Sequence, residues 1–101
     1  MNNFPYISVV IPAYNERDYL EISLSSLANQ SYPKDRYEVI VVDNASTDST
    51  ALIAREWGAR VVEEPCKGVA RARQTGFLAA RGEIIASTDA DTAVSPDWLA
   101  H

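Results

Sequence analysis

Four short runs of apolar, mostly β-branched residues recur along the chain, separated by longer polar stretches. The runs occupy residues 7–11, 39–42, 61–62 and 84–86. Their apolar residues are nearly continuous rather than alternating, which is typical of parallel strands covered on both faces. The pattern therefore predicts four strands of a buried sheet.

The segments between these runs have the spacing of amphipathic helices. In residues 16–30, Leu20, Leu24 and Leu27 fall on one stripe, and Asn15 is the expected N-cap. A second helix is expected over residues 47–57 and a third over residues 69–81. The residues expected at the ends and on the packed face of these two helices are Ser46 as cap and Gly58 as stop of the second, Gly82 as stop of the third, and Ala72, Gly76 and Ala79 as the small face of the third.

This order of elements predicts an α/β fold. Strands alternating with helices favour a doubly wound, mainly parallel sheet with right-handed crossovers, and analogy with such sheets gives the strand order 3-2-1-4. Residues 95–98 add a fourth expected helix start, because Pro96 suits the first helical position. With 101 residues, 47% of them hydrophobic, the chain is expected to form a single domain over residues 1–101.

Polar residues follow the carboxyl end of each expected strand, where doubly wound sheets bind their ligands. The most informative are Asp89 and Asp91, two residues apart after the fourth run. Side chains two apart in extended backbone point the same way, so both carboxylates can converge on one cation. Oxygen ligands favour Mg²⁺ or Mn²⁺, and Mg²⁺ is usually held by one or two carboxylates plus substrate phosphates. The pair predicts a metal site for a phosphate ester or nucleotide, with Asp91 as the preferred ligand and Asp89 also suited to a ribose or a bound water.

Each of the other polar candidates has an alternative interpretation. Asp43 ends a strand, where it can accept from a base or sugar hydroxyl or simply from local turn amides. Tyr14 can stack on a nucleobase or pack beside Pro12, and Glu16 can serve a ligand or the helix dipole. The nearby cations are either a solvated helix face or a diphosphate site at a helix N-terminus: Lys67, Arg71 and Arg73. Glu63 and Glu64 are interpreted as solvent-exposed acids, and Trp57 and Trp98 as core or capping aromatics.

Charge and composition narrow the partners. The net charge of −5 and the pI near 4.7 argue against nucleic acid. No stretch approaches the roughly 20 apolar residues of a membrane span, and residues 1–6 lack the features of a signal peptide, so a cytoplasmic location is the default expectation. The single Cys66 cannot form an intrachain disulfide, which fits a reducing compartment.

Four motifs together resemble the N-terminal, nucleotide-binding portion of a family 2 glycosyltransferase of the GT-A fold. Residues 7–16, ISVVIPAYNE, resemble the opening motif, and residues 41–48, VVDNASTD, resemble the second. Residues 68–76, GVARARQTG, resemble the third, and residues 89–91 match the metal-site motif. Two positions depart from the family pattern: Asn44 replaces a common second acid, and Gln74 replaces an Asn. The resemblance covers nearly the whole chain.

The resemblance implies a role for each matched residue. Pro12, Tyr14 and Glu16 would border the nucleoside of a nucleotide-diphosphate sugar, and Asp43 would bind its base. Arg73 would lie toward the base or diphosphate, Asp89 would face ribose or metal, and Asp91 would ligate Mn²⁺ or Mg²⁺. UDP is favoured over GDP because it is the family's commonest donor nucleotide, whereas the sugar and the acceptor are left open.

The resemblance also implies a reaction that this chain would not complete. An acceptor hydroxyl displaces the nucleoside diphosphate with inversion, while the metal neutralises the growing charge. The general base is expected after residue 101, so no catalytic residue is assigned, and the chain is expected to be truncated and inactive alone. The resemblance implies that the parent protein would act in cell-wall or polysaccharide synthesis, with the inner face of a membrane as the alternative location.

Truncation would leave the fourth strand as an edge, so self-association through residues 83–88 is expected. The main functional alternative is a non-catalytic nucleotide-sugar-binding module of the same fold. A haloacid-dehalogenase-like phosphatase is disfavoured, because it needs Thr or Val where Ala93 stands. A receiver-type signalling module is disfavoured because it needs paired acids after the first strand.

Overall fold

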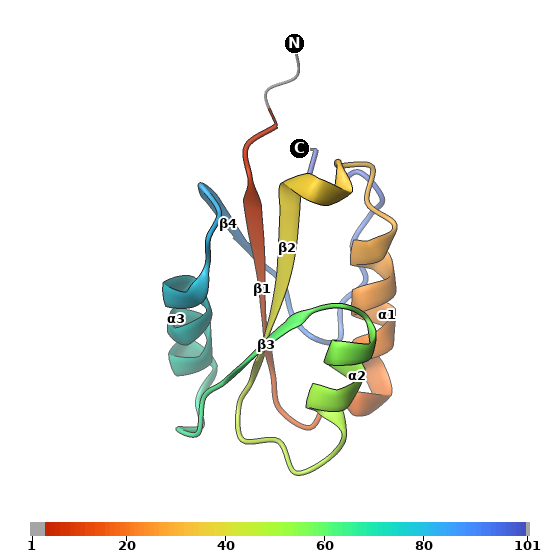
Figure 1. The fold of residues 1–101 in the computed structure, drawn as a ribbon. Helices are drawn as coiled ribbons and strands as arrows, with labels where there is room; N and C mark the ends of the chain where they lie inside the picture. Colours follow the sequence, from red (N-terminus) through yellow and green to blue (C-terminus); the bar gives the residue numbers. More distant parts are fainter. Residues whose placement is uncertain (1–3, 101) are drawn as a thin grey trace.

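The computed structural model describes residues 4–100. His101 and residues 1–3, which begin the segment expected not to be a signal peptide, lie outside the described residues. Figure 1 shows a central sheet flanked by helices on both faces. The strands are β1 (Ile7–Ala13), β2 (Tyr37–Asp43), β3 (Arg60–Glu63) and β4 (Ile84–Ser87), and the helices are α1 (Arg17–Ala28), α2 (Thr50–Glu56) and α3 (Val69–Ala79), with a 3₁₀ turn η1 at Lys34–Arg36.

All neighbouring strands are parallel, in the order β3-β2-β1-β4, which confirms the predicted topology. β1 and β2 are paired along their whole lengths, from Ile7 opposite Tyr37 to Ala13 opposite Asp43. The carboxyl ends of the strands therefore lie at one edge of the sheet. We call the segments at these ends, residues 14–16, 43–48, 64–68 and 88–92, together with Arg73 on α3, whose side chain is ion-paired with Asp89, the carboxyl rim.

The sheet separates two hydrophobic clusters, because successive strand residues point to opposite faces. Helices α1 and α2 cover one face and α3 covers the other (Figure 1). The predicted stripe of α1 is buried, with Leu20, Leu24 and Leu27 at 4% exposure or less. It packs against the β1 side chains Ile7, Val9 and Ile11, whereas Val10, Ile40, Val42 and Ala72 form the cluster beneath α3.

Helix α3 packs closely on the sheet because its contact face carries small residues. Ala72 and Gly76 are buried, as predicted for this face, and Ala79 is half-buried. A Cβ built on Gly76 would lie 2.3 Å from Val10 Cγ1, closer than any packed side chain allows. Gly76 thus fixes the distance between α3 and the sheet.

The predicted helix starts were wrong by one to three residues for α1 and α2. Helix α1 begins at Arg17 after Glu16, and α2 begins at Thr50 after Ser49, with no side-chain cap in either case. The expected cap Asn15 instead accepts the Thr47 N–H through Oδ1, and Ser46 Oγ accepts the Asn15 N–H. The two residues bind each other's loops because the adjacent ends of β1 and β2 bring those loops together.

The end of the described chain also differs from prediction. Helix α3 stops at Ala79, before Gly82, and residues 96–100 form turns with bonds from Trp98 N–H to Ser95 O and from Ala100 N–H to Asp97 O. Strand β4, expected to be buried, leaves Ile84 46% and Ile85 43% exposed because it pairs only with β1. No helix in the described part of the chain is long and apolar enough to span a membrane.

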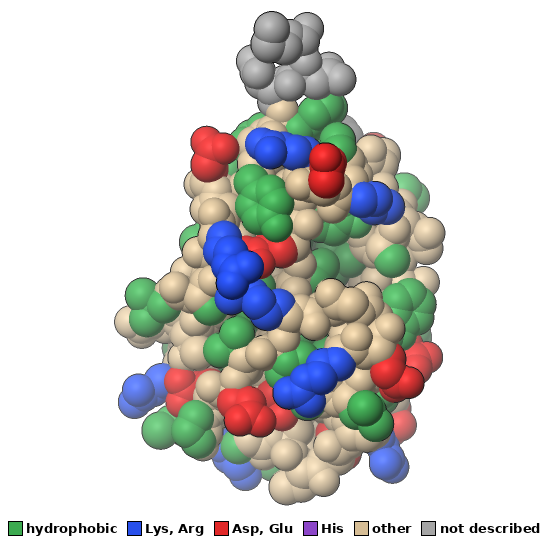
Figure 2. Space-filling model, in the orientation of Figure 1, with side chains coloured by type: hydrophobic (Ala, Val, Ile, Leu, Met, Phe, Trp, Pro, Cys, Tyr) green, Lys and Arg blue, Asp and Glu red, His purple; other side chains and the backbone are tan. Residues whose placement is uncertain are grey.

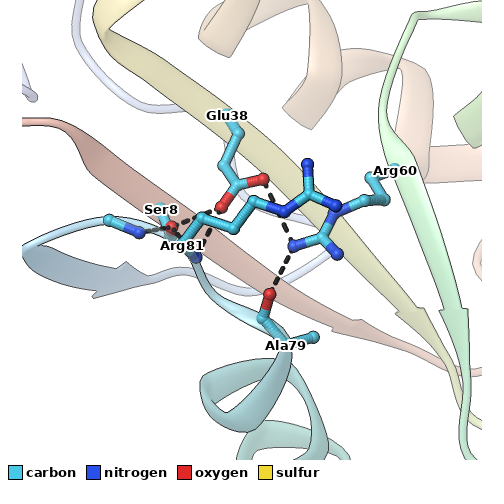
Figure 3. Close-up of polar contacts among 6 residues, drawn as sticks. Ser8, Glu38, Arg60, Ala79 and Arg81 are labelled. Carbon is cyan, nitrogen blue, oxygen red and sulfur yellow. Dashed lines mark hydrogen bonds and ion pairs between the residues drawn. The ribbon is translucent and has the colours of Figure 1, made fainter.

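A polar network joins the amino ends of β1, β2 and β3 to the connection between α3 and β4 (Figure 3). Glu38 Oε2 accepts Ser8 Oγ at 2.6 Å and the Arg81 N–H at 2.9 Å, while Glu38 Oε1 lies 3.3 Å from Arg60 Nη2. Arg60 also donates to the Ala79 carbonyl at the end of α3. We call these residues, Ser8, Glu38, Arg60, Ala79 and Arg81, the amino-end network.

Candidate functional site

The carboxyl rim gathers the predicted site residues from four separate segments of the chain. Asp43 is the last residue of β2, and other predicted site residues follow β1 and β4. The segment at the start of α2 fixes the backbone of the loop after β1. Asn15 and Ala45 have positive φ angles of 51° and 64°, and the Glu16 N–H donates to Thr50 Oγ1 at 3.1 Å. Thr50 is fully buried, so this bond anchors Glu16 at the start of α1.

Glu16 lies within an acidic group on the rim. Its pKa is raised by partial burial and then by the negative charges of Asp91, Asp48 and Asp89. Asp48 is different, because hydrogen bonds from Thr50 outweigh its slight burial and lower its pKa. The structure therefore brings Glu16, Asp89 and Asp91 into one repulsive field, although Glu16 is 73 positions away from Asp89.

Arg73 and Asp89 form an ion pair across the rim. Arg73 Nη2 lies 3.1 Å from Asp89 Oδ1, and the two side chains are 40% and 64% exposed. The ion pair occupies part of the Asp89 carboxylate, while Asp91 is exposed with only a long bond from its neighbour Thr92 at 3.3 Å. Asp91 is accordingly the more accessible of the two carboxylates, whereas the Asp89 carboxylate is paired with Arg73.

Tyr14 is paired with Lys67. The Lys67 Nζ atom lies 4.7 Å from the centre of the Tyr14 ring and 3.0 Å from its hydroxyl oxygen. Tyr14 is 43% exposed, so the ring remains accessible beside the cation. No local sequence pattern predicts this pair, because the two residues are 53 positions apart.

Asp43 lies deeper than the other acids, at 9% exposure. Its Oδ1 atom accepts the Ser46 N–H at 3.1 Å, so the turn interpretation of this residue is part of its role. Asp43 also lines a pocket of about 270 Å³ with Ala45, Ser46, Glu63, Glu64 and Pro65. The half-buried Pro12 pairs with Val42 within the sheet just before the rim.

The interpretation of Glu64 as a solvent-exposed acid was wrong. Glu64 is half-buried, and its carboxylate accepts the Thr75 hydroxyl at 2.5 Å and the Cys66 N–H at 2.9 Å. These bonds lower its pKa, helped by the positive charge of Arg71. Glu64 thus orders the loop before α3, a role that only the folded contact with Thr75 reveals.

The rim offers oxygen ligands suited to Mg²⁺ or Mn²⁺ but no complete protein cage. Within residues 4–100, no three His, Cys, Asp or Glu side chains are grouped closely enough to hold a metal by themselves. Asp91 and Asp89 are carboxylates, which accept only, and Mg²⁺ commonly takes one or two such ligands together with substrate phosphates. The donor set therefore fits a cation that arrives with a phosphorylated ligand.

The rim pocket beside Asp43 is smaller than two cavities elsewhere in the described part of the chain. A cavity of about 310 Å³ lies at the opposite end of the sheet beside Lys34, Trp57 and Arg60, and an apolar one of about 500 Å³ lies beside Ile84 and Trp98. Figure 2 shows basic side chains interspersed with acidic ones on the face drawn, without one large basic patch. Charged side chains, and not the volume of its pocket, distinguish the rim from the other hollows.

Comparison with known proteins agrees with this arrangement. The family model described as "Glycosyl transferase family 2" matches residues 8–101. The glycosyltransferase AglE of Haloferax volcanii is 38% identical over 97% of this chain and 34% of its own length.

Two solved structures superimpose closely on the chain. Residues 1–349 of TarS of Staphylococcus aureus in complex with UDP give a TM-score of 0.89 at 32% identity, over 94% of this chain and 30% of that fragment. The mannosyltransferase PcManGT of Pyrobaculum calidifontis with GDP-Man and Mn²⁺ gives 0.82 at 40% identity, over 88% of this chain and 28% of that protein. The chain spans about a third or less of the length of these proteins. Its sequence and its fold both show that the chain belongs to glycosyl transferase family 2.

Proposed function

We propose that the chain is the donor-binding part of a glycosyltransferase and that its carboxyl rim binds a nucleotide-diphosphate sugar together with Mn²⁺ or Mg²⁺. The observation that carries the proposal is the gathering of Glu16, Asp89 and Asp91 on one rim, where partial burial and then the negative charges of Asp91, Asp48 and Asp89 raise the pKa of Glu16. Two cations, Lys67 and Arg73, lie in the same rim. A divalent cation relieves the repulsion, and the flanking cations suit a diphosphate.

We assign each site residue the role that the family resemblance implies. Asp91 binds the metal, and Asp89 shares the metal or contacts the ribose. Arg73, which bridges to Asp89 at 3.1 Å, faces the base or diphosphate. The nucleoside lies against Pro12, Tyr14 and Glu16, with the base at Asp43.

The identity of the nucleotide base is a separate part of the proposal. We favour UDP over GDP, and TarS, which was solved with UDP, supports this choice. PcManGT was solved with GDP-Man and Mn²⁺, so guanine is the alternative to be tested directly. The Mn²⁺ in that structure supports a divalent cation in the proposed site.

In the proposed reaction, an acceptor hydroxyl displaces the nucleoside diphosphate from the sugar with inversion. A bound divalent metal supplies Lewis-acid stabilisation of the negative charge on the leaving diphosphate. The residues of this chain bind and orient the donor, and none is assigned as the general base. We therefore expect donor binding with little or no transfer by the chain alone.

Calorimetric titration with UDP and GDP, with and without Mn²⁺, tests the proposal. Wild type should bind one nucleotide in an Mn²⁺-dependent manner, and Asp91→Ala should lose that dependence. Asp35→Ala is the matched control, because it removes one exposed acid from η1, away from the rim. The proposal fails if the folded wild type binds neither nucleotide or if Asp91→Ala binds as well as wild type.

A non-catalytic nucleotide-sugar-binding role is the second candidate, because the chain spans only part of its relatives. Both roles require donor binding at the carboxyl rim, but only the glycosyltransferase role requires transfer of the sugar to an acceptor. A longer protein containing this chain that binds the donor but releases no nucleoside diphosphate in the presence of acceptors would favour the binding role.

A further inference from the structure

We propose that Asn44 is a positioning residue of the rim: its buried side-chain amide fixes residues 64–68 and thereby holds Lys67 over Tyr14, where the Lys67 ammonium meets the diphosphate of the donor. This inference rests on the proposed function, which already counts Lys67 among its cations, and adds Asn44 to it. From the sequence, Lys67 is only one of three candidate cations and Asn44 only a departure from the family pattern.

The Asn44 side chain forms hydrogen bonds through both its amide nitrogen and its amide oxygen. The residue is 5% exposed, and its Nδ2 atom donates to the carbonyl oxygens of Glu64 and Cys66, each at 2.9 Å. Its Oδ1 atom accepts the Gly68 N–H at 2.9 Å, and its own N–H donates to the Ala13 carbonyl at 2.8 Å. One residue thus joins the end of β1, the loop after β3 and the start of α3.

This arrangement requires an amide. A side-chain amide has two donor hydrogens and an accepting oxygen, whereas an ionised carboxylate only accepts. An Asp at position 44 would retain an acceptor for the Gly68 N–H but would face the carbonyl oxygens of Glu64 and Cys66 without a hydrogen to share. The departure from the family's acid at this position is therefore matched to the loop of this particular chain.

The loop held by Asn44 includes Lys67. Its neighbours Cys66 and Gly68 are both bonded to Asn44, and Gly68 has a φ of 142°, a conformation that side chains rarely adopt. Lys67 Nζ contacts the Tyr14 ring and hydroxyl, and no carboxylate within the described residues forms an ion pair with it. Arg73, in contrast, is already paired with Asp89. Lys67 is therefore a cation on the rim whose charge is still available to an anionic ligand.

A double-mutant cycle tests the link between the two residues. UDP affinity is measured by calorimetry with saturating Mn²⁺ in wild type, Asn44→Ala, Lys67→Gln and the double variant. If Asn44 acts through Lys67, each single change weakens binding about tenfold, the size of one charge-assisted contact, and the double variant is no more than about tenfold weaker. Independent effects, giving a loss of about a hundredfold, would overturn the proposal, as would an unchanged affinity in either single variant.

Gln30→Ala is the matched control for Asn44→Ala. Gln30 is 4% exposed, and its amide also bridges backbone groups, donating to Ser26 and Ser95 carbonyls and accepting the Leu99 N–H. Its removal should lower stability without changing UDP affinity, so a loss of affinity common to both variants would overturn the proposal by assigning Asn44 a general structural role.

Hydrogen exchange at the Gly68 amide tests the loop without any ligand. Asn44→Ala should accelerate this exchange more than exchange in the β1 and β2 core, and unchanged protection would overturn the positioning role. If Asn44→Ala does not fold, Asn44→Asp serves in its place, with the same weakening of UDP binding expected. Failure of wild type to bind UDP or GDP would instead count against the proposed function, leaving the exchange result to decide the role of the loop.

Discussion

Two glutamates at opposite ends of the same sheet have opposite surroundings. Glu38 lies in the amino-end network, where burial alone would raise its pKa, but hydrogen bonds from Ser8 and Arg81 and the charges of Arg60 and Arg81 lower it. Glu16 lies on the carboxyl rim, where both burial and neighbouring acids raise its pKa. The surroundings of Glu38 therefore favour its ionised form, whereas those of Glu16 disfavour it.

The difference separates residues that maintain the fold from residues that await a ligand. Each partner of Glu38 belongs to an element that the network ties together, so its charge is neutralised within the chain. Asp91, Asp48 and Asp89 instead add to the burial that raises the pKa of Glu16, and carboxylates with perturbed pKa values cluster at functional sites. The amino end therefore stabilises the fold, and the rim is where binding is expected.

Loss of Glu38 should have the largest effect on stability. Glu38→Ala removes the carboxylate that accepts from the Ser8 hydroxyl and the Arg81 N–H and that pairs with the partly buried Arg60, and we expect a loss of about 2–3 kcal/mol in the free energy of unfolding. Urea denaturation measures this loss. Glu38→Gln keeps one acceptor and should lose less, whereas an effect of Glu38→Ala below about 0.5 kcal/mol, the usual range of surface substitutions, would contradict the structural role of the network.

The pH dependence of stability should reflect Glu38 at the acid end. Because the pKa of Glu38 is lower in the folded chain than its ordinary value of 4.5, the unfolded chain takes up the proton first. The stability that Glu38 contributes is complete above pH 4.5 and is lost as the pH falls through the lower folded pKa. Urea denaturation from pH 7 to pH 3 should show a shallower acid loss in Glu38→Gln than in wild type, and identical slopes would count against this assignment.

Replacement of Glu16 should have a smaller and opposite effect. A raised pKa in the folded chain means that ionised Glu16 is unfavourable at neutral pH, a penalty relieved as the pH falls through the raised value. Glu16→Gln should therefore stabilise the metal-free chain at pH 7 by about 0.2–1 kcal/mol, the range for exposed charge pairs, and should weaken Mn²⁺-dependent UDP binding. Destabilisation of the metal-free chain would contradict the repulsion.

The smallest effect is expected at the edge of the sheet, in neither polar region. Strand β4 pairs only with β1 and leaves Ile84 and Ile85 more than 40% exposed, so we expect weak self-association through residues 83–88. Light scattering should show an apparent mass that rises with concentration and falls in Ile85→Lys. A strictly monomeric wild type at high concentration would contradict this expectation.

The sequence predicted the scaffold better than the contacts between its loops. The runs at 7–11 and 39–42 are long and β-branched, so strands β1 and β2 and the order β3-β2-β1-β4 could be predicted. Asn15 and Ser46 look like helix caps because capping is a local pattern, yet each bonds to the other's loop, 31 positions away. Such bonds depend on the pairing of β1 with β2, which local propensity does not describe.

The same limit applies to the site. Motifs placed Asp89, Asp91 and Arg73 at strand and helix ends, and the structure brings them to one rim. From the sequence, Asn44 was identified only as a departure from a family pattern, and Lys67 only as one of three nearby cations. Their contacts join segments 22 to 53 positions apart, so they became visible only in the folded chain.

The most direct measurement is a titration of the ¹⁵N-labelled chain with UDP and Mn²⁺, followed by amide NMR signals. Paramagnetic Mn²⁺ broadens signals of nearby nuclei, so it reports where the cation binds. If the carboxyl rim is the donor site, the signals of Glu16, Asp89 and Asp91 should broaden first, while those of Glu38, Arg60 and Gly82 persist. Broadening centred on the amino-end network, or no broadening of the rim with UDP in excess, would contradict the account.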